Sequence, residues 1–302
     1  MIPERPPPSM HPLPSTDLLL LKLRLQRFWH RRRLGQHFLT DHAVLGRIAR
    51  LCAPDPETLA VEIGAGPGLL TTRLAERSGA VLAIELDTRF KPFHEEVFGA
   101  QPRLEWIYRD ALQLDLHDIA RDHLQRRGWT RAILTGNLPF QVTSPLLFRQ
   151  CDPNAPWSSI TVMVQREVAD RIASPCGSKA YGALTVKLAC WWRLVDRFEV
   201  PSDRFFPRPK VQASLIRLER LPNDRQPDPR FWPTLSRFVD AAFGQRRKKL
   251  LNTLASLWPQ MPHPATAQRV LMDMNISPLV RAEQLSPQTL TRLCRRLLDS
   301  PN

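Results

Sequence analysis

The sequence predicts an α/β protein: a Rossmann-like sheet of parallel strands, followed by a small all-helical domain. Short apolar runs alternate with segments of helical spacing over residues 41–165. A linker rich in proline follows at residues 221–229, and helical spacing then continues towards the C-terminus. Runs that are apolar along their whole length are typical of a parallel sheet with helices on both faces.

The individual elements follow from the same pattern. The expected parallel strands are residues 59–63, 80–86, 104–108, 132–135 and 160–164. Helical patterns fit between them, for example at 69–77 and 116–126. Residues 197–200 and 211–218 predict an antiparallel pair at the sheet edge. Beyond the linker, the expected helices are residues 235–257, 265–274 and 287–298.

Positive charge is concentrated at the two ends of the chain. Of the formal net charge of +14, residues 1–40 carry +5, residues 41–220 carry +3 and residues 221–302 carry +6. Basic flanks around a nearly neutral middle favour binding of a phosphate backbone by the flanks. The predicted parts are a basic, proline-rich extension (1–33), a main α/β domain (34–220) and a helical RNA-binding domain (227–302).

Composition also bears on the compartment. No apolar run reaches the roughly 18 to 20 residues that span a bilayer, so we expect no membrane anchor. The five cysteines are scattered without a C-x-x-C pair, which favours reduced thiols in the cytoplasm. Residues 18–25 predict a short amphipathic helix, with Arg31, Arg32 and Arg33 after it. A mitochondrial transit peptide is the alternative, although Asp17 and the early prolines count against it.

Two further groups of residues are explained by structure alone. His117 and His123 lie at helical spacing with two aspartates, a pattern more typical of a solvated helix face than of a metal site. The pair Trp191-Trp192 is more typical of a core than of a platform for base stacking. We therefore expect no metal ion.

A glycine-rich segment follows the first predicted strand and opens a helix. Glu62 is followed by glycine at alternate positions, Gly64, Gly66 and Gly68. Glycine at such a turn lets the backbone approach a ligand closely. The spacing differs from the G-x-G-x-x-G of a dinucleotide fold.

Carboxylates also end the next two strands. Glu85 ends the second, where a carboxylate can bind ribose hydroxyls, and Asp110 ends the third, where it can receive the amine of an adenine ring. Capping of the following helices is the alternative explanation for each residue alone. Three successive strand ends with carboxylates favour a nucleoside-cofactor site.

The segment Asn137-Leu138-Pro139-Phe140 follows another apolar strand. The Asn137 side-chain oxygen and a backbone carbonyl of Leu138 or Pro139 can accept both N–H groups of an exocyclic amine. Those two bonds draw the nitrogen towards tetrahedral geometry and free its lone pair. Phe140 can stack on the base and favour the positive charge that develops on the nitrogen. The two sites together suggest methyl transfer to a nucleobase amine.

These residues belong to a set of motifs that resembles the KsgA-type small-subunit ribosomal RNA adenine dimethyltransferases, within the rRNA adenine N6-methyltransferases. The resemblance runs from Leu34 to roughly Leu254. Its segments are residues 34–39 (LGQHFL), 61–71 (VEIGAGPGLLT), 84–87 (IELD), 110–111 (DA), 137–140 (NLPF), 205–211 (FFPRPKV) and 243–250 (FGQRRKKL).

The resemblance implies a seven-stranded S-adenosylmethionine (SAM)-dependent methyltransferase sheet with a small helical C-terminal domain. The residues that it implies for the cofactor are His37, Leu39, Gly64, Gly66, Glu85, Asp110 and Asn137. Asn137 would lie where donor and target meet, and Phe140 and Phe205 would sandwich the target adenine. Phe206, beside Phe205, leaves open which ring stacks; a Phe206 that packs in the core would favour Phe205.

The implied reaction is dimethylation of two adjacent adenines in the 3′-terminal hairpin of small-subunit rRNA, by a cytoplasmic monomer acting on the immature subunit. Two alternatives remain: a resistance-type methyltransferase of large-subunit rRNA, and a non-catalytic RNA-binding or transcription factor on the same fold. Segment 243–250 favours the small subunit, and the intact 137–140 motif favours an enzyme. We expect the cations of that segment to contact RNA phosphates: Arg246, Arg247, Lys248 and Lys249.

Overall fold

The computed structural model describes residues 12–25, 36–52, 55–139, 142–245, 247–254, 257 and 263–300. The chain divides into two compact units, each described here by itself. The sheet unit comprises Met1–Thr143, Pro156–Arg166 and Val195–Leu218. The helical unit comprises Ser144–Ala155, Glu167–Leu194 and Glu219–Asn302.

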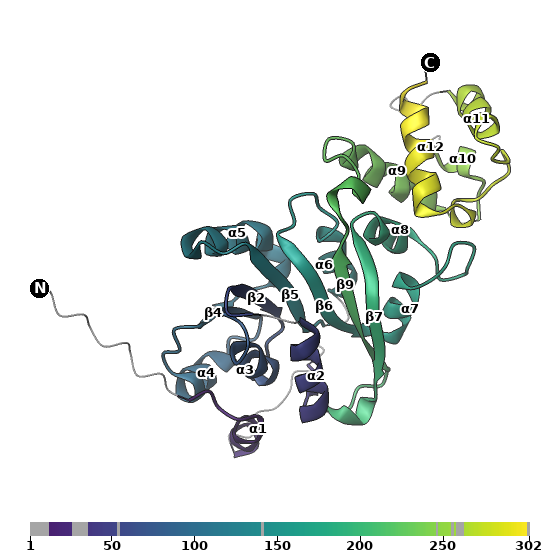
Figure 1. Ribbon diagram of the computed structural model, residues 1–302. Helices are drawn as coiled ribbons and strands as arrows, with labels where there is room; N and C mark the ends of the chain where they lie inside the picture. The colour runs from purple at the N-terminus through teal and green to yellow at the C-terminus, as the bar shows by residue number, and fades with distance from the viewer. Residues whose placement is uncertain are drawn as a thin grey trace, which may run out of the picture. The chain divides into compact units, whose positions relative to one another are not determined.

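A seven-stranded sheet has the strand order β4-β3-β2-β5-β6-β9-β7, which confirms the predicted fold class (Figure 1). Its strands are β2 (Thr58–Ile63), β3 (Ala80–Glu85), β4 (Leu104–Tyr108), β5 (Arg131–Asn137), β6 (Trp157–Gln165), β7 (Trp192–Val200) and β9 (Ala213–Arg220). The pairs from β4 to β6 are parallel. All seven predicted strands are present, and β7 and β9 lie at one edge as expected.

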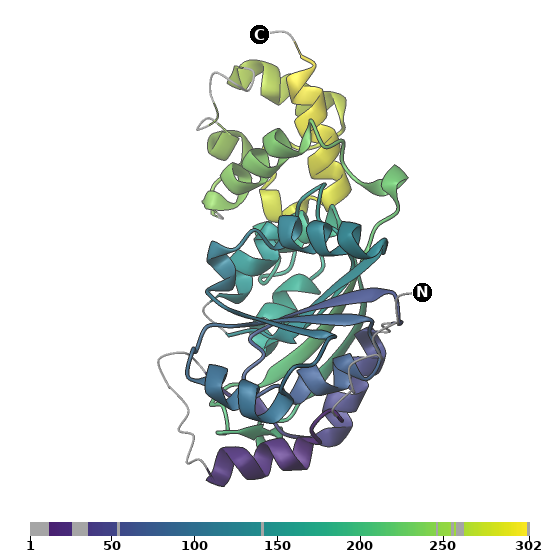
Figure 2. The same cartoon turned by 90° about the vertical axis from the view of Figure 1, so that its left-hand side faces the viewer.

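The central strands form because their residues can be buried on both faces. Every residue of β2 and β3 is buried, whereas β4 at the edge is only half-buried. Helices cover both faces of the sheet (Figure 2). The helices of the sheet unit are α1 (Thr16–Leu25), α2 (His42–Cys52), α3 (Leu69–Ala75), α4 (Phe90–Phe98) and α5 (Leu116–Arg127).

Helix α1 confirms the helix expected in the N-terminal extension and shows how it packs. Leu19 is fully buried in the core of the sheet unit, together with Leu45 and Leu74. Lys22 forms an ion pair with Glu96 of α4. Part of the extension is therefore an integral element of this unit. The expected arginine run at 31–33 lies outside the described residues.

The remaining helices are α6 (Thr143–Arg149), α7 (Arg166–Ile172), α8 (Ala183–Ala189), α9 (Trp232–Gly244), α10 (Leu250–Leu254), α11 (Pro264–Asp273) and α12 (Pro287–Leu298). Apolar side chains of α9 and α12 form the core of the helical unit, with Leu235, Phe238, Leu290 and Leu293 fully buried. The predicted boundaries of α11 and α12 are confirmed to within a residue.

The single helix expected at 235–257 is wrong. Helix α9 ends at Gly244, and α10 begins only at Leu250. Neighbouring like charges in a helix repel one another, and the cationic run lies between the two helices. The Leu250 N–H donates to the Val280 carbonyl (2.8 Å), a long-range bond that fixes where the chain re-enters a helix. Periodicity alone cannot reveal such a bond.

A second, two-stranded antiparallel sheet pairs β1 (Phe38–Leu39) with β8 (Phe205–Phe206). Neither strand was expected from the apolar pattern, because each has only two residues. The pairing places Phe38 opposite Phe206 and Leu39 opposite Phe205. The Thr40 N–H also donates to the Arg204 carbonyl (2.9 Å). Two motif segments far apart in the sequence are thus held side by side.

Candidate active site

A cavity of about 150 Å³ lies where β2, β3 and β5 end. Ligands of open α/β sheets bind outside the carboxyl ends of the strands, so its position agrees with this architecture. The predicted site residues that line it are His37, Gly64, Gly66, Glu85, Asp110, Asn137, Leu138, Pro139 and Phe205. Leu39 lines a smaller neighbouring cavity instead. Phe140 lies outside the described residues.

The glycine loop is shaped by close backbone approach. Gly64 has a φ of 74°, and a Cβ there would lie 3.2 Å from the Asn137 carbonyl oxygen. Gly66 has a φ of 55°, and a Cβ there would lie 3.2 Å from the Phe38 ring. Because both conformations are left-handed, any L side chain would be strained as well as crowded. The loop therefore keeps a backbone wall open to a ligand.

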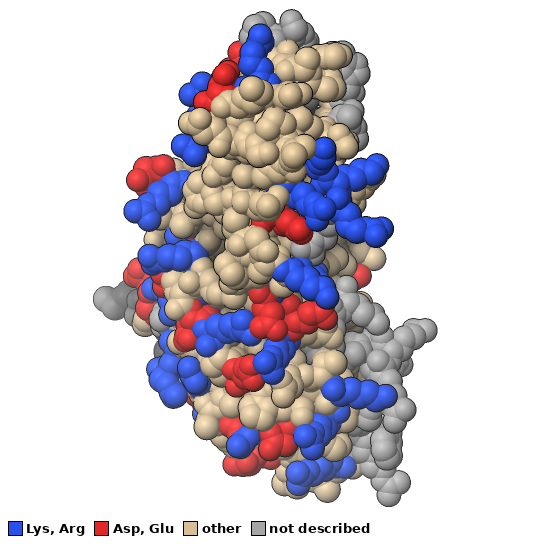
Figure 3. Space-filling model, turned by 90° about the vertical axis from the view of Figure 1, so that its right-hand side faces the viewer, with Lys and Arg blue, Asp and Glu red and all other residues tan. Residues whose placement is uncertain are grey.

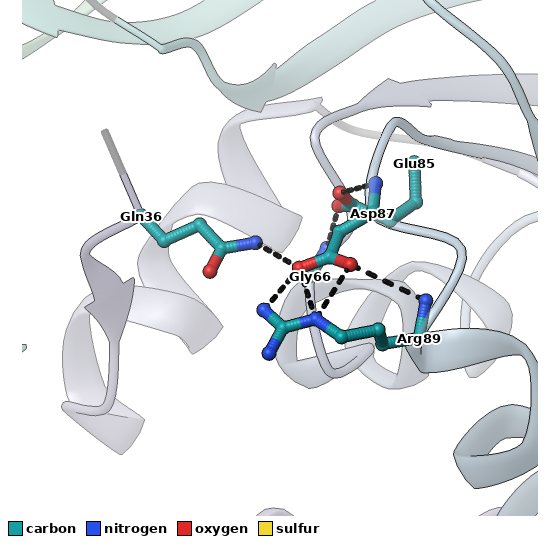
Figure 4. A network of polar contacts seen from close by, with 5 residues as sticks. All are labelled: Gln36, Gly66, Glu85, Asp87 and Arg89. Atoms are coloured by element: carbon teal, nitrogen blue, oxygen red, sulfur yellow. Dashed lines mark hydrogen bonds and ion pairs between the residues drawn. The ribbon is translucent and has the colours of Figure 1, made fainter. Parts of the chain in front are cut away.

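Glu85 is held rigidly at the end of β3. Its Oε2 accepts the Gly66 N–H (2.7 Å), and its Oε1 accepts the Asp87 N–H (2.8 Å; Figure 4). Its burial raises the pKa of Glu85 above the usual value, while these backbone bonds act in the opposite direction. Each carboxylate oxygen keeps a further lone pair for a ligand hydroxyl.

Asp87 organises a network that the sequence did not reveal as part of the site. Its carboxylate accepts bonds from Arg89 Nε (2.9 Å) and Nη2 (2.6 Å), and from Gln36 Nε2 (2.9 Å). Although burial acts to raise it, these bonds lower the pKa of Asp87 to about 2. Gln36, Gly66, Glu85, Asp87 and Arg89 form what we term the Asp87 network (Figure 4). It ties the 34–39 motif to the end of β3.

Asp110 caps the short 3-10 helix Ala111–Gln113, because its Oδ1 accepts the Leu112 N–H (2.9 Å). The capping explanation is therefore correct for one oxygen. The residue is half-buried and still lines the cavity, so its second oxygen is available to a ligand. The neighbouring Arg109 also lines the cavity, although no sequence motif identified it as a site residue.

Asn137 is oriented by a contact across the cavity. Its Nδ2 donates to the His37 carbonyl (2.7 Å), and the His37 ring donates through Nδ1 to the Pro207 carbonyl (2.7 Å). The amide is thereby fixed with Oδ1 as its acceptor for a substrate. The Pro139 carbonyl accepts the Val142 N–H (3.1 Å), so the Leu138 carbonyl is the better second acceptor.

The two adjacent phenylalanines of β8 differ sharply. Phe205 is 6% exposed and lines the cavity, whereas Phe206 is 65% exposed. Phe206 therefore does not pack in the core, and it is Phe205 that faces the cavity. Successive side chains of a strand point to opposite sides, and the pairing of Leu39 with Phe205 turns the first ring inward.

Two buried titratable residues support the glycine loop. Glu62 accepts a bond from Thr71 Oγ1 (2.6 Å), and desolvation raises its pKa to about 8. His94 stacks on Trp106 at 3.6 Å between ring centroids and donates through Nε2 to the Gly66 carbonyl (2.9 Å). Burial lowers the pKa of His94 to about 4, so it is neutral at pH 7. His94 had no signal in the sequence because its partners are distant along the chain.

Three of the four expected RNA-binding cations, Arg247, Lys248 and Lys249, are exposed in the loop between α9 and α10 rather than on a helix. Arg246 lies outside the described residues. We term residues 247–249 the basic loop. Lys and Arg side chains are spread over the face in Figure 3, and in several places Asp and Glu lie next to them. A run of consecutive cations is therefore distinctive.

The exposure of their side chains tests the expectations for the Trp191-Trp192 pair and for the segment from His117 to His123. Trp191 and Trp192 are buried, as expected. The solvated helix face is wrong for His123, which is buried 3.4 Å from Glu105, because its ring packs inward. Asp118 and Asp122 of the same pattern are exposed and pair with Arg121 and Arg126. No helix in the described part of the chain is long and apolar enough to cross a membrane.

The fold and the cavity define a class of protein. The residues present fit SAM: a glycine loop without side chains, the buried carboxylate of Glu85 at the end of β3, and Asp110 at the next strand end. The chain is a SAM-dependent methyltransferase. The family model for ribosomal RNA adenine dimethylases matches residues 27–290, and the chain belongs to that family.

Relatives and solved structures agree with this assignment. The chain is 34% identical over 273 residues to a ribosomal RNA small subunit methyltransferase A from Shouchella clausii, covering 90% of each chain. It is 37% identical over 251 residues to the protein of that name from Phenylobacterium zucineum, covering 82% of this chain and 83% of that one. The recognised family and an rRNA adenine dimethyltransferase activity are thereby confirmed.

Two solved structures share the fold. A dimethyladenosine transferase from Plasmodium falciparum superposes with a TM-score of 0.66 at 19% identity, covering 84% of this chain and 94% of that chain. The 23S rRNA methyltransferase ErmE superposes with a TM-score of 0.63 at 23% identity, covering 86% and 99%. At these identities the likeness supports the fold alone.

Proposed function

We propose that this protein uses SAM to dimethylate the N6 amines of two adjacent adenines in the 3′-terminal hairpin of small-subunit (16S) rRNA. The observation that carries the proposal is the position of Asn137, Leu138 and Pro139 on the same cavity as Glu85 and the glycine loop. A base amine placed against Asn137 would lie beside a nucleoside cofactor placed against Glu85. The small-subunit assignment draws on the names of the curated relatives.

In this proposal Gly64, Gly66, Glu85 and Asp110 hold the cofactor, with His37 at its border. Glu85 receives the ribose hydroxyls, and the second oxygen of Asp110 receives the adenine amine. When bound, SAM supplies an activated methyl group on a sulfonium. The protein then contributes orientation and electrostatics, because the donor itself provides the driving force. Leu39, in the neighbouring cavity, supports this wall by packing.

Asn137 Oδ1 and the Leu138 carbonyl act on the target amine by accepting its two N–H groups. Withdrawal of these protons from the ring plane localises the nitrogen lone pair. The Asn137–His37 bond keeps the amide in this orientation before substrate arrives, and preorganised dipoles are effective in a cavity that excludes water. Phe205 contacts the base from the β8 side, and Phe140 is assigned to the opposite face.

The basic loop binds rRNA phosphates, and the protein acts as a monomer on the immature small subunit in the cytoplasm. Exposed cations suit this role because phosphate contacts release counterions without demanding fixed geometry. We assign no substrate contact to the N-terminal extension (residues 1–33). If the substrate is an immature small subunit, the protein also takes part in the biogenesis of that subunit.

Mass spectrometry of rRNA from cells with and without the gene tests the proposal. We expect two dimethyladenosines near the 3′ end of 16S rRNA that disappear on deletion and return with the intact gene but not with Asn137→Ala. Loss of an adenine modification from large-subunit rRNA instead would support the resistance-type alternative. Unchanged modification of both rRNAs, with no SAM binding by calorimetry, would support a non-catalytic factor.

A further inference from the structure

A second concave surface lies wholly within the helical unit, in residues that the family motifs do not include. It is a groove of about 630 Å³. Four of its lining residues are arginines: Arg193, Arg225, Arg292 and Arg295. None of the described lining residues is Asp or Glu. We term this surface the arginine groove.

One wall of the groove is a polar stripe of α12. Gln288, Thr291, Arg292 and Arg295 recur at the spacing of one helix face, while Leu290, Leu293 and Leu297 of the other face are buried. The stripe extends from Gln288 to Arg295, a rise of roughly 10 Å along the helix. Its N-terminal end also carries the positive end of the helix dipole. Positive charge therefore extends along this wall rather than converging on one point.

The other wall is rigid before any ligand arrives. Arg220 lies 4.7 Å and 5.0 Å from the ring centroids of Trp191 and Trp192. Its Nη2 donates to the Asp152 carbonyl (2.9 Å) and to Gln226 Oε1 (3.3 Å). Burial lowers the pKa of Arg220 to about 10, so it stays charged at pH 7. This arginine holds the wall in place, and a preformed wall reduces the ordering cost of binding.

Few acidic side chains neutralise the charge of the arginines that line the groove. Arg193 pairs with Glu219 (3.1 Å) at the rim. Within the described part of the chain, Arg225 and Arg292 have no ion-pair partner, and both are exposed. Like charges around one concavity repel each other, and an anion with several charges relieves that repulsion. A guanidinium also matches the geometry of a phosphate through two parallel hydrogen bonds.

We propose that the arginine groove binds the phosphodiester backbone of rRNA, as a contact separate from the basic loop. Cations spread along a helix fit a polyanion better than a single phosphate. This inference rests on the proposed function only in taking rRNA as the ligand. Base-specific recognition is not required, because phosphate contacts position a nucleic acid without reading its sequence.

The test compares two double variants of the full chain with the same change in net charge. Arg225→Glu/Arg292→Glu alters the groove. Arg269→Glu/Arg296→Glu alters two exposed arginines of α11 and α12 that do not line it. Fluorescence anisotropy measures binding to a 16S rRNA transcript free of ribosomal proteins, without SAM, between about 50 and 200 mM salt.

For the groove variant we expect the slope of log affinity against log salt to decrease by about 1.4 to 1.8, or 0.7 to 0.9 for each lost phosphate contact. The control should keep the parental slope. Equal changes in both variants, or none in either, would overturn the proposal. Should charge reversal unfold the protein, as judged by thermal melting, Arg225→Gln/Arg292→Gln provides the same comparison without new carboxylates.

A second substrate separates RNA from a protein ligand. Suppose that the groove variant binds the free transcript like the parent but loses affinity for assembled small-subunit particles. A ribosomal protein would then occupy the groove, and the RNA assignment would be overturned. Because the readout is binding without SAM, a chain that methylates no rRNA can still show the slope difference. Failure of the groove and failure of the proposed reaction are therefore distinguishable.

Discussion

The Asp87 network and the basic loop represent two ways of using charge. Asp87 and Glu85 are 3% and 6% exposed, and each carboxylate oxygen has a fixed hydrogen-bond partner. The cations of the basic loop are exposed and consecutive. Buried charges act through exact placement at short range, whereas exposed ones act over longer range and are screened by salt. Changes at the first region should therefore alter affinity and turnover, and changes at the second should alter salt dependence.

The largest effect is expected at Asn137. Asn137→Ala should lower the single-turnover rate of methylation by about 10²- to 10³-fold, the range seen when one preorganised group is removed from a transition state. SAM affinity should change much less, because the proposed partner of this side chain is the target amine. Calorimetry and quenched-flow assays at saturating donor and RNA measure both quantities. A near-parental rate would contradict the role of Asn137.

Glu85→Ala should affect binding of the donor. The loss of a charged hydrogen-bond acceptor should weaken SAM affinity by about 1–3 kcal/mol in calorimetry. Glu76→Ala, at an exposed position after α3, is the matched control and should leave affinity unchanged. If both variants bind SAM like the parent, the ribose assignment is wrong.

Asp87→Asn should reduce stability in a pH-dependent way. The pKa of Asp87 is 3.8 in the unfolded chain and is lowered to about 2 in the folded protein. The ionised carboxylate therefore stabilises the fold fully above pH 3.8, and this stabilisation is lost as the pH falls through about 2. We expect the variant to lose about 1–2 kcal/mol at pH 7 and to converge with the parent in acid. Urea unfolding at several pH values measures this difference. Asp122→Asn, on the exposed face of α5, should lack the effect; a constant offset at all pH values would refute the assignment.

Charge reversal in the basic loop should have a smaller, salt-sensitive effect. Lys248→Glu/Lys249→Glu should reduce the salt slope of RNA binding by about 0.7 to 0.9 for each lost contact and leave SAM affinity intact. The control reverses Arg126 and Arg127 on the surface of α5. Parental salt dependence in the folded loop variant would show that the loop is only a solvated surface.

The smallest effect is expected at Phe206. Because this ring is 65% exposed, Phe206→Ala should change unfolding free energy by no more than about 0.5 kcal/mol. Methylation should persist, whereas Phe205→Ala should slow it. Suppose instead that Phe206→Ala is stable but inactive, while Phe205→Ala still methylates rRNA. The ring that stacks on the target base would then be Phe206.

Some residues of the site could be identified from the sequence, whereas the contacts between them could be seen only in the folded structure. Gly64, Glu85 and Asn137 could be identified from sequence because each follows an apolar strand, and the ends of parallel strands meet at one edge of a sheet. Gln36 and Asp87 could not be paired, since 51 residues separate them. The His37–Asn137 contact spans 100 residues. No periodicity encodes such contacts, because they depend on how loops close over the sheet.

The sequence by itself determined which segments form strands, the glycine loop, the 137–140 motif and the family, because these depend on local composition and spacing. Tertiary structure alone decided which phenylalanine turns inward, where helix α9 ends and how four arginines gather on one groove. Phe205 and Phe206 are chemically identical in the sequence; only the register of β8 against β1 distinguishes them. Arg193, Arg225 and Arg292 likewise become one surface only when α12 packs in the helical unit, since burial of its leucine face dictates where its polar stripe points.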